Sequence, residues 1–396
     1  MSTAQDPIVI VGMSRTPMGA FQGELSPLAA HQLGSQSITA TLDNAGIKPD
    51  SIDEVLMGCV LPAGQGQAPA RQAALNAGLL QSTGATTINK MCGSGLKSVM
   101  LGHDLIRAGS ANTILAGGME SMSNAPYLLD KARGGYRMGH GNIIDHMFMD
   151  GLEDAYDKGK LMGVFADDTA RQMQISRESQ DEFAIESLNR AQRAANDGCF
   201  AGETAAVTVE TRKGRFTIDT DELPRTAKPD KIPHLKPAFH PEGSVTAATS
   251  SGISDGAASL VLMKRSQADK MGLKIRAQIA AHATHARAPA DFTLAPIGAL
   301  EKLFDQTGWA VNDVDLFEIN EAFAVVTLAA MKQLALPHEK VNIHGGACAL
   351  GHPIGASGAR ILVTLLSAME QKDLKTGMAS LCIGGGEAVG IAIERV

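Results

Sequence analysis

Apolar residues along the chain follow two alternating patterns. Short runs rich in β-branched residues predict strands, of which the clearest are residues 7–11, 53–57, 113–116, 316–319 and 379–383. Longer Ala/Leu-rich stretches with apolar residues at helical spacing predict helices, at 29–45, 96–108 and 322–334. Strands that alternate with helices in both halves of the chain are typical of a layered α/β fold.

A weak internal repeat divides this pattern into two halves. The segment SIDEVLMG (51–58) resembles NDVDLFEI (312–319), and TILAGGMES (113–121) resembles SLCIGGGEA (380–388). A glycine-rich helix start lies between these elements in each half, at 93–95 and at 351–358. The sequence therefore indicates two related α/β halves.

The middle of the chain differs from both halves. From 122 to 250 it is polar and irregular, and only 177–196 has the pattern of a long amphipathic helix. The strand-like apolar run at 260–263 indicates that the chain returns to the first half there. We therefore expect an N-terminal half made of 1–121 and 251–274, an inserted loop domain at 122–250, and a C-terminal half at 275–396.

Composition and charge narrow the classes of function. Among 396 residues, aromatics make up only 4% and the formal net charge is −7, which argues against a nucleic-acid binder. An anionic ligand must then meet a local basic patch. Five cysteines without a CxxC pair, no secretory-type leader and no run of ~18 apolar residues lead us to expect a cytoplasmic protein that interacts with no membrane.

The first motif that carries chemistry is NKMCGSGLKSV (89–99). Cys92 ends a strand-like segment, and glycines and a serine open a helix directly after it. Free N–H groups and the positive end of the helix dipole favour a thiolate at such a place. Cys92 is therefore a candidate nucleophile, although a buried structural cysteine is the alternative.

The second motif is HGGACALGHPIGASGAR (344–360). His352 stands between Gly351 and Pro353, on a predicted turn where its ring could take a proton from a thiol. A phosphate-binding dinucleotide loop is a competing interpretation, but the glycines lack GxGxxG spacing and Pro353 interrupts the turn. An ordinary histidine without a catalytic role remains open.

Two further motifs lie in the C-terminal half. In LCIGGGEAVG (381–390), Cys382 ends a strand and three glycines offer bare backbone and N–H donors to a ligand. In EINEAFA (318–324), Asn320 follows a strand, where its amide could orient a water or a carbonyl group. The alternative for Asn320 is a helix N-cap.

Taken in order, the blocks NKMCGSGLKSV, GGMESMSNAPY, NEAFA, GGACALGHPIGASGAR and CIGGG resemble the signature blocks of the thiolase family, over essentially the whole chain. The resemblance implies a five-layered αβαβα fold of two similar halves plus a loop domain. It also implies an acetyl-CoA C-acetyltransferase that condenses two acetyl-CoA reversibly. Coenzyme A thioesters are then the substrates, with no metal and no tightly bound cofactor.

The same resemblance implies roles for individual residues. Cys92 would be acylated, His352 would activate it, and Cys382 would be the acid/base for the α-carbon of the second acetyl-CoA. Asn320 would hold a water that forms one oxyanion hole with His352. The backbone N–H groups of Cys92 and Gly384 would form the other.

Five positions match family residues that hold coenzyme A. Ser251 would bind the pantetheine chain and Arg225 would lie near the adenosine phosphates. Leu152 and Met162 would line the pantetheine tunnel, and Phe323 would lie beside the reacting acyl groups. The apolar three could instead be core residues, and Arg225 a solvated charge.

The chain departs from the family pattern in its tunnel loop and before the GGA run. Leu161 stands where some members carry a histidine, the loop is about one residue longer, and His344 replaces a frequent asparagine. These departures leave the acyl-chain preference open.

Three other functions stay open. They are a degradative 3-ketoacyl-CoA thiolase of broader chain length, a non-catalytic acyl-CoA carrier and a nicotinamide dehydrogenase. The family also implies a homotetramer, a dimer of dimers, with residues 122–145 as candidate contacts.

Overall fold

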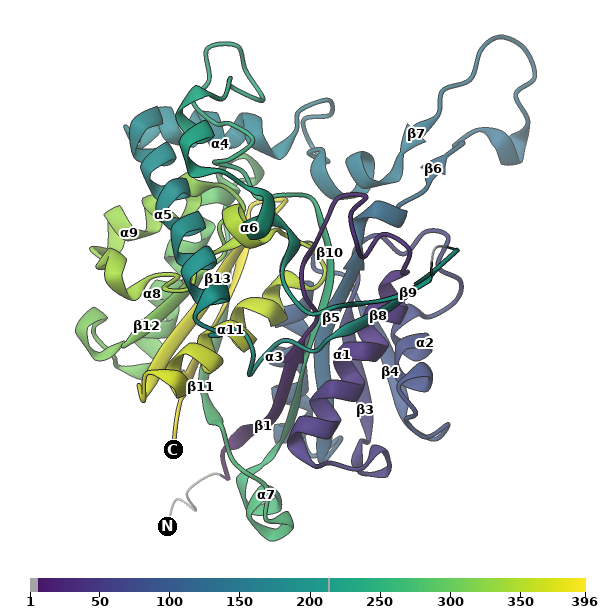
Figure 1. The fold of residues 1–396 in the computed structure, drawn as a ribbon, viewed down its shortest axis with the longest axis vertical. Coiled ribbons are helices and arrows are strands. Elements are labelled where there is room, and N and C mark those ends of the chain that lie inside the picture. Colours follow the sequence, from purple (N-terminus) through teal and green to yellow (C-terminus); the bar gives the residue numbers. More distant parts are fainter. Residues whose placement is uncertain (1–5, 213) are drawn as a thin grey trace.

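Ten strands form one mixed sheet in the computed structural model, which describes residues 6–212 and 214–396 (Figure 1). The strand order is β12-β13-β14-β11-β1-β10-β5-β3-β4, with β2 paired to β10. The strands are β1 (Ile8–Arg15), β2 (Gly19–Ala20), β3 (Glu54–Gly58), β4 (Gly84–Ile88), β5 (Thr113–Ser121), β10 (Ser254–Lys264), β11 (Ala277–Ala286), β12 (Leu316–Ile319), β13 (Thr376–Ile383) and β14 (Glu387–Glu394).

The sheet consists of two similar halves joined at its centre. In one half β3 runs parallel to β5, and β10 and β1 follow antiparallel. In the other, β12 runs parallel to β13, and β14 and β11 follow antiparallel. Among the residues that the structure describes, Val9 with Gln278 and Ile10 with Ala277 are the strand pairs across the junction. The predicted repeat is confirmed, because its segments form β3 and β12, and β5 and β13.

Helices cover both faces of each half. The outer helices are α1 (Ala30–Ala45) and α2 (Pro69–Asn76) on one half, and α8 (Ala295–Thr307) and α9 (Ala324–Leu334) on the other. Between the halves, α3 (Ser94–Ala108) and α11 (Ser357–Gln371) contact each other and strands of both halves. From one side of the molecule to the other, the layers are helices, strands, helices, strands and helices, so the expected five-layered α/β fold is confirmed. Two short helices complete the halves, α7 (Arg265–Met271) and α10 (Ala347–Leu350).

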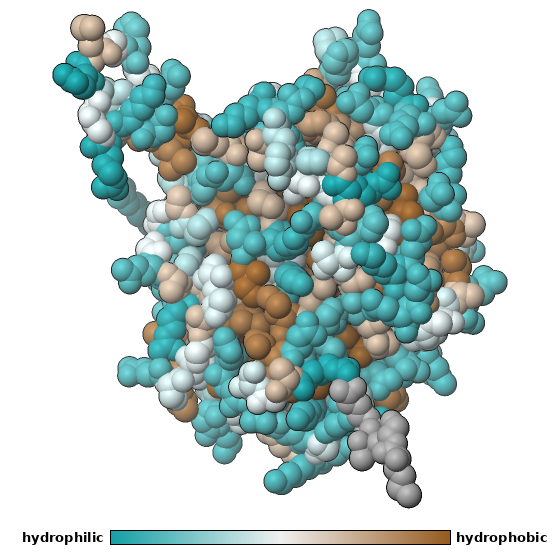
Figure 2. Space-filling model, turned by 180° about the vertical axis from the view of Figure 1, so that it is seen from behind, coloured by the Kyte–Doolittle hydropathy of each residue, from teal (hydrophilic) through white to brown (hydrophobic). Residues whose placement is uncertain are grey.

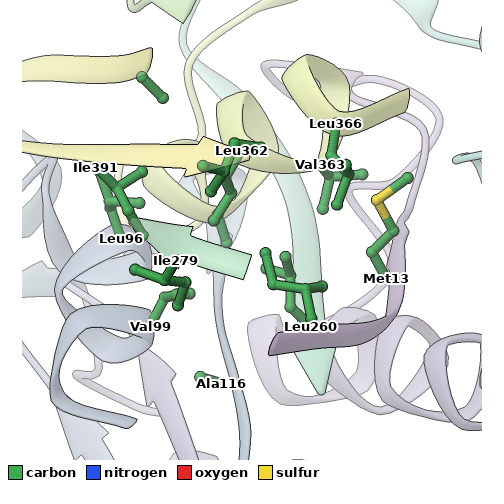
Figure 3. Close-up of a cluster of buried hydrophobic side chains, with 14 of the residues drawn as sticks. Met13, Leu96, Val99, Ala116, Leu260, Ile279, Leu362, Val363, Leu366 and Ile391 are labelled. Carbon is green, nitrogen blue, oxygen red and sulfur yellow. The ribbon is translucent and has the colours of Figure 1, made fainter. Parts of the chain in front are cut away.

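The central core fixes α3 against α11. Leu96 and Val99 of α3 meet Leu362 and Leu366 of α11 in one buried cluster (Figure 3). At the start of both helices the backbones touch: a Cβ added at Gly358 would lie 2.4 Å from the backbone nitrogen of Leu96. Glycine is therefore required there, and this close approach places the loops before the two helices side by side.

The described part of the segment 122–250 carries three α-helices and two small hairpins, besides short 3-10 and π turns: α4 (Met162–Gln172), α5 (Arg177–Asn196), α6 (Glu222–Thr226), β6 (Tyr127–Leu128) with β7 (Ile144–Asp145), and β8 (Val207–Thr211) with β9 (Gly214–Ile218). The predicted helix at 177–196 is confirmed. The pattern missed α4, because its buried Asp167 breaks the apolar face and accepts hydrogen bonds from the backbone of Ser244 and Val245.

After this segment the chain returns to the first half, as expected, because β10 pairs with β1 and β5. The three domain boundaries stay a prediction. No helix among residues 6–212 and 214–396 is both long enough and apolar enough to cross a membrane.

Candidate active site

Cys92 lies on a tight turn directly before α3. The Ser94 hydroxyl accepts a hydrogen bond from the backbone N–H of Lys90 at 2.8 Å and donates to the carbonyl of Met91 at 2.6 Å. Asn89 accepts from the N–H of Met91 at 2.9 Å, and Met91 itself has a left-handed φ of 46°. These contacts explain why a polar, glycine-rich sequence presents the cysteine at the start of a helix.

The thiol of Cys92 is neutral at pH 7. Burial raises its pKa to about 11, although the backbone N–H groups of Gly384 and of Cys92 itself favour the thiolate; the charge of Glu120 raises the pKa further. The N–H groups at the helix start thus favour the thiolate, as expected, but they do not bring the pKa below its ordinary value. Desolvation outweighs the two N–H donors.

Cys382 lies beside Cys92 from the other half of the molecule. It is 1% exposed near the end of β13, and burial followed by the charge of Cys92 raises its pKa well above the usual range. A Cβ added at Gly93 would lie 2.5 Å from the Ile383 side chain, so the two cysteine segments are in direct contact. Since Gly384 follows at once, both predicted thiols and the predicted backbone donor meet at one place.

His352 is a buried, neutral base with a defined tautomer. Its Nδ1 lies 2.5 Å from the hydroxyl of Ser357, which donates its own hydrogen to the carbonyl of Pro353 at 2.9 Å. With the Ser357 hydroxyl donating to Pro353, we assign the ring proton to Nδ1, which donates it to Ser357 and leaves the lone pair on Nε2. Burial, and then the charge of Arg360, lower the pKa to about 3.

Asn320 contributes an amide without any partner. It is 1% exposed, and neither side-chain atom has a hydrogen-bond partner among the described residues; the same holds for Nε2 of His352. Its backbone N–H is held by the carbonyl of Ser380 at 3.0 Å. The helix N-cap alternative is wrong, because α9 begins at Ala324 and Phe323 is its capping residue.

One segment links the asparagine and histidine loops. The N–H of Ser251 donates to the carbonyl of Ala322, and the N–H of His352 donates to the carbonyl of Gly252, both at 2.9 Å. Ser251 therefore lies between the Asn320 turn and the His352 turn. Buried polar atoms without partners are rare, and here they sit on turns that a third segment ties together.

Two buried carboxylates support these loops and were missed in the sequence. Glu120 accepts hydrogen bonds from the N–H groups of Val60, Leu61 and Gly355, at 2.9, 3.1 and 2.9 Å, and burial raises its pKa to about 7. Glu321 accepts from the amide of Asn342 at 2.8 Å. Their positions inside the GGMES and NEAFA blocks are the signal that could have identified them.

The apolar residues expected to hold the pantetheine and acyl groups lie around the thiols. Leu152 packs in the same cluster as Cys92. Met162 and Phe323 pack in the cluster of Cys382, and the sulfur of Met162 would lie 3.6 Å from a Cβ added at Gly384. The structure thus brings these three predicted residues to the site.

Arg225 is not part of this group. On α6 it is half exposed, forms an ion pair with Glu24, and lines a cavity of about 350 Å³ beside β8 and β9. A separate groove of about 360 Å³ reaches Gly252, next to Ser251, and two lysines that were not anticipated line it, Lys228 and Lys231.

The two residues that depart from the family pattern, Leu161 and His344, have ordinary surroundings. Leu161 caps the start of α4, directly before Met162. His344 is buried edge-on against the ring of Phe200, and burial lowers its pKa.

Comparison with family models covers nearly the whole chain. Residues 8–266 match the model for the thiolase N-terminal domain, and residues 273–395 match the model for the thiolase C-terminal domain. The chain therefore belongs to the thiolase family.

Similar proteins extend over the same length. The chain is 48% identical over 390 residues to a protein of Escherichia coli named acetyl-CoA acetyltransferase, and 47% identical to one of that name from Cupriavidus necator; each match covers 98% of this chain and 99% of the relative. A probable acetyl-CoA acetyltransferase of Dictyostelium discoideum is 47% identical, with 98% and 94% covered.

Proposed function

We propose that this chain is an acetyl-CoA C-acetyltransferase, which condenses two acetyl-CoA into acetoacetyl-CoA and free coenzyme A and also catalyses the reverse cleavage. The observation that carries the proposal is that the buried Nε2 of His352 has no hydrogen-bond partner among the described residues, while Ser357 holds the ring through Nδ1. A neutral base of this kind can take a proton from a neutral thiol such as that of Cys92. The names of the relatives support the substrate.

The first half-reaction would acylate Cys92. Its sulfur attacks the thioester carbonyl of acetyl-CoA while its proton passes to Nε2 of His352. Cys382 gives its proton to the sulfur of the departing coenzyme A. The backbone N–H groups of Cys92 and Gly384, which already reach the Cys92 sulfur, are near enough to bind the oxygen of an acyl group on it.

The second half-reaction would return every proton. The Cys382 thiolate, a strong base because burial raises the pKa of its thiol, removes a proton from the α-carbon of a second acetyl-CoA. The unpartnered amide of Asn320, through a water, and the protonated His352 would stabilise the enolate oxygen. The enolate attacks the acetyl group, and the departing Cys92 sulfur regains its proton from His352.

Mass spectrometry of the protein after brief mixing with acetyl-CoA tests the proposal. We expect one acetyl group on Cys92, none in Cys92→Ser, and a trapped acetyl group in Cys382→Ser. An adduct at another residue would contradict the mechanism, and no adduct together with undiminished acetyl-CoA binding would indicate a carrier. Faster cleavage of 3-ketodecanoyl-CoA than of acetoacetyl-CoA would indicate a degradative thiolase of broader chain length.

The remaining parts of the proposal concern context. We infer that the reaction needs no metal and no tightly bound cofactor, since thiol and imidazole chemistry accounts for each step. A cytoplasmic location accords with five free cysteines.

We also propose a homotetramer. Residues 127–145 project from the body of the molecule (Figures 1 and 2), and Tyr127, Leu129, Met138 and Ile143 on them are 54–97% exposed. Large apolar side chains on a projection are typical of an interface between copies. Light scattering of a Met138→Asp, Ile143→Asp double variant should show dimers. A variant mass equal to that of the wild type would rule this contact out.

A further inference from the structure

Away from the active site, three potential metal ligands from both halves of the chain converge. They are His103 and Asp104 on α3 and His282 on β11. Nδ1 of His103 lies 3.1 Å from Oδ1 of Asp104 and 3.2 Å from Nε2 of His282, and that Nε2 lies 2.9 Å from the same Oδ1. Three ligand atoms thus form a nearly equilateral triangle.

A bulge in β11 turns His282 toward this place. Ile279 pairs with Ile393 of β14, and both face the central core, while the next pair is Ala281 with Ala392, so β11 contains one extra residue. Because of that residue, His282 pairs with Ile391 and faces the central layer of helices. Strict alternation from Ile279 would have turned His282 to the opposite face.

Hydrogen bonding alone explains only part of the arrangement. If both rings donate an N–H to Oδ1 of Asp104, their nitrogens stand 3.2 Å apart, both protonated and with no bond between them. If His282 donates to Nδ1 of His103 instead, that Nδ1 faces Oδ1 of Asp104 at 3.1 Å with no proton between them, so one of the three contacts lacks a hydrogen bond in either case. A divalent cation satisfies all three atoms. With bonds of ~2.1 Å to atoms spaced 2.9–3.2 Å, the angles between bonds are ~95°, which leaves room for water ligands.

We propose that His103, Asp104 and His282 bind a divalent transition metal of the zinc type, which fastens α3 of the N-terminal half to β11 of the C-terminal half. Two imidazoles and one carboxylate are ligands that zinc commonly takes. Asp104 is about half exposed, with 52% of its side chain accessible, so a metal can enter from solvent. The positive charge of Arg107 acts on His103 and would repel a bound cation. The negative charge of the Asp104 carboxylate is therefore essential to the site.

The site is separate from the catalytic one. His103 lies nine residues into α3, so it is ~14 Å along the helix axis from the end next to Cys92. The proposal therefore concerns a structural metal and does not alter the inference that the reaction itself uses none. Acetyl transfer should continue after the metal is removed.

Titration calorimetry with zinc chloride on the EDTA-treated, dialysed chain tests the proposal. We expect one zinc per chain, bound at least ~100-fold more weakly by Asp104→Ala and by His282→Gln. Asp104→Ala changes a solvent-facing helix position and so should fold. His285→Ala, on the same strand outside the cluster, is the matched control and should bind as the wild type does.

Melting curves give a second measurement on the same proteins. Zinc should raise the Tm of the wild type and of His285→Ala by a few degrees but leave Asp104→Ala unchanged. Equal binding by wild type and both cluster variants would place the zinc elsewhere, for instance on the active-site thiols, and would overturn the proposal. Absence of stoichiometric binding by the wild type would overturn it as well.

Discussion

The Ser357 hydroxyl accepts a hydrogen bond from the Nδ1–H of His352, with 2.5 Å between the heavy atoms, because its own hydrogen is donated to the carbonyl of Pro353. This relationship decides which ring nitrogen is the base. The serine that begins α11 thereby acts on the chemistry without touching the substrate, and it does so through the histidine tautomer.

Replacement of Ser357 by alanine tests this positioning role. We expect kcat to fall ~10-fold, since one neutral hydrogen bond contributes about 1–1.5 kcal/mol, while the KM for acetyl-CoA changes little. Loss of the defined tautomer should also change the imidazole 15N chemical shifts of His352. Ser367→Ala on the same helix also removes a buried hydroxyl, one that bonds Gln371, and should leave both readouts unchanged. Unaltered kcat and 15N shifts in Ser357→Ala would show that the hydroxyl is dispensable.

Asn320 and Asn342 form a natural pair of contrasting buried amides. The Asn320 amide has no partner in the part of the chain that the structure describes. Asn320→Ala should therefore change the free energy of unfolding by less than ~1 kcal/mol yet lower kcat ~10²–10³-fold. The Asn342 amide accepts a hydrogen bond from the N–H of Ile319 and donates to the carbonyl of Ile319 and to the carboxylate of Glu321. Asn342→Ala should therefore cost ~2–4 kcal/mol of stability. Urea unfolding and steady-state kinetics on both variants give the comparison. A large loss of stability in Asn320→Ala would assign it a structural role.

The ionisation of Cys92 predicts an unusual pH profile of reactivity. The pKa of about 11 means that the thiol stays protonated at neutral pH, so the thiolate fraction grows about tenfold per pH unit up to that value. Alkylation by iodoacetamide, followed at Cys92 by peptide mass spectrometry, should accelerate from pH 6 through pH 10. N-acetylcysteine, the control, should level off above its ordinary pKa. A plateau above pH 6 would instead show a thiolate–imidazolium pair with His352.

The order of helices and strands could be predicted from the sequence, but the packing around them could be predicted less well. The apolar pattern located β12 and α5 with their observed ends. The apolar residues of α5 are buried at helical spacing, and β12 is a short run whose four residues are all buried. The same pattern predicted β5 too short, at 113–116, whereas the strand is Thr113–Ser121. The strand continues through Gly117, Gly118 and Glu120, which are buried but carry no apolar side chains. A pattern of apolar residues cannot reveal a strand whose buried positions are glycine and a bonded carboxylate.

Burial explains the other differences. The helix start at Cys92 is visible in the sequence, but the desolvation that raises its pKa comes from burial, and Cys92 packs against two clusters whose residues lie far apart in the chain. Likewise, a resemblance points to Arg225, yet in this fold that side chain is engaged by Glu24. Which basic residue faces a groove depends on how the inserted segment folds back, and no local pattern records that.

The groove beside Ser251 gives the last prediction, which concerns the phosphates of coenzyme A. Since the chain carries a net charge of −7, these phosphates need a local positive patch. Lys228 and Lys231 line this groove, whereas Arg225 faces a different cavity. We expect Lys228→Ala and Lys231→Ala each to raise the KM for acetyl-CoA ~2–5-fold, as exposed charge pairs contribute up to about 1 kcal/mol, with kcat unchanged. The increase should shrink at high salt, because screening weakens the same contacts in the wild type.

Two controls accompany this prediction. Acetyl-pantetheine, which lacks the nucleotide phosphates, should react equally well with all variants, and Lys236→Ala, outside the groove, should behave as the wild type. A larger effect of Arg225→Ala than of either lysine variant would instead place the phosphates at the β8–β9 cavity, where the family resemblance puts them.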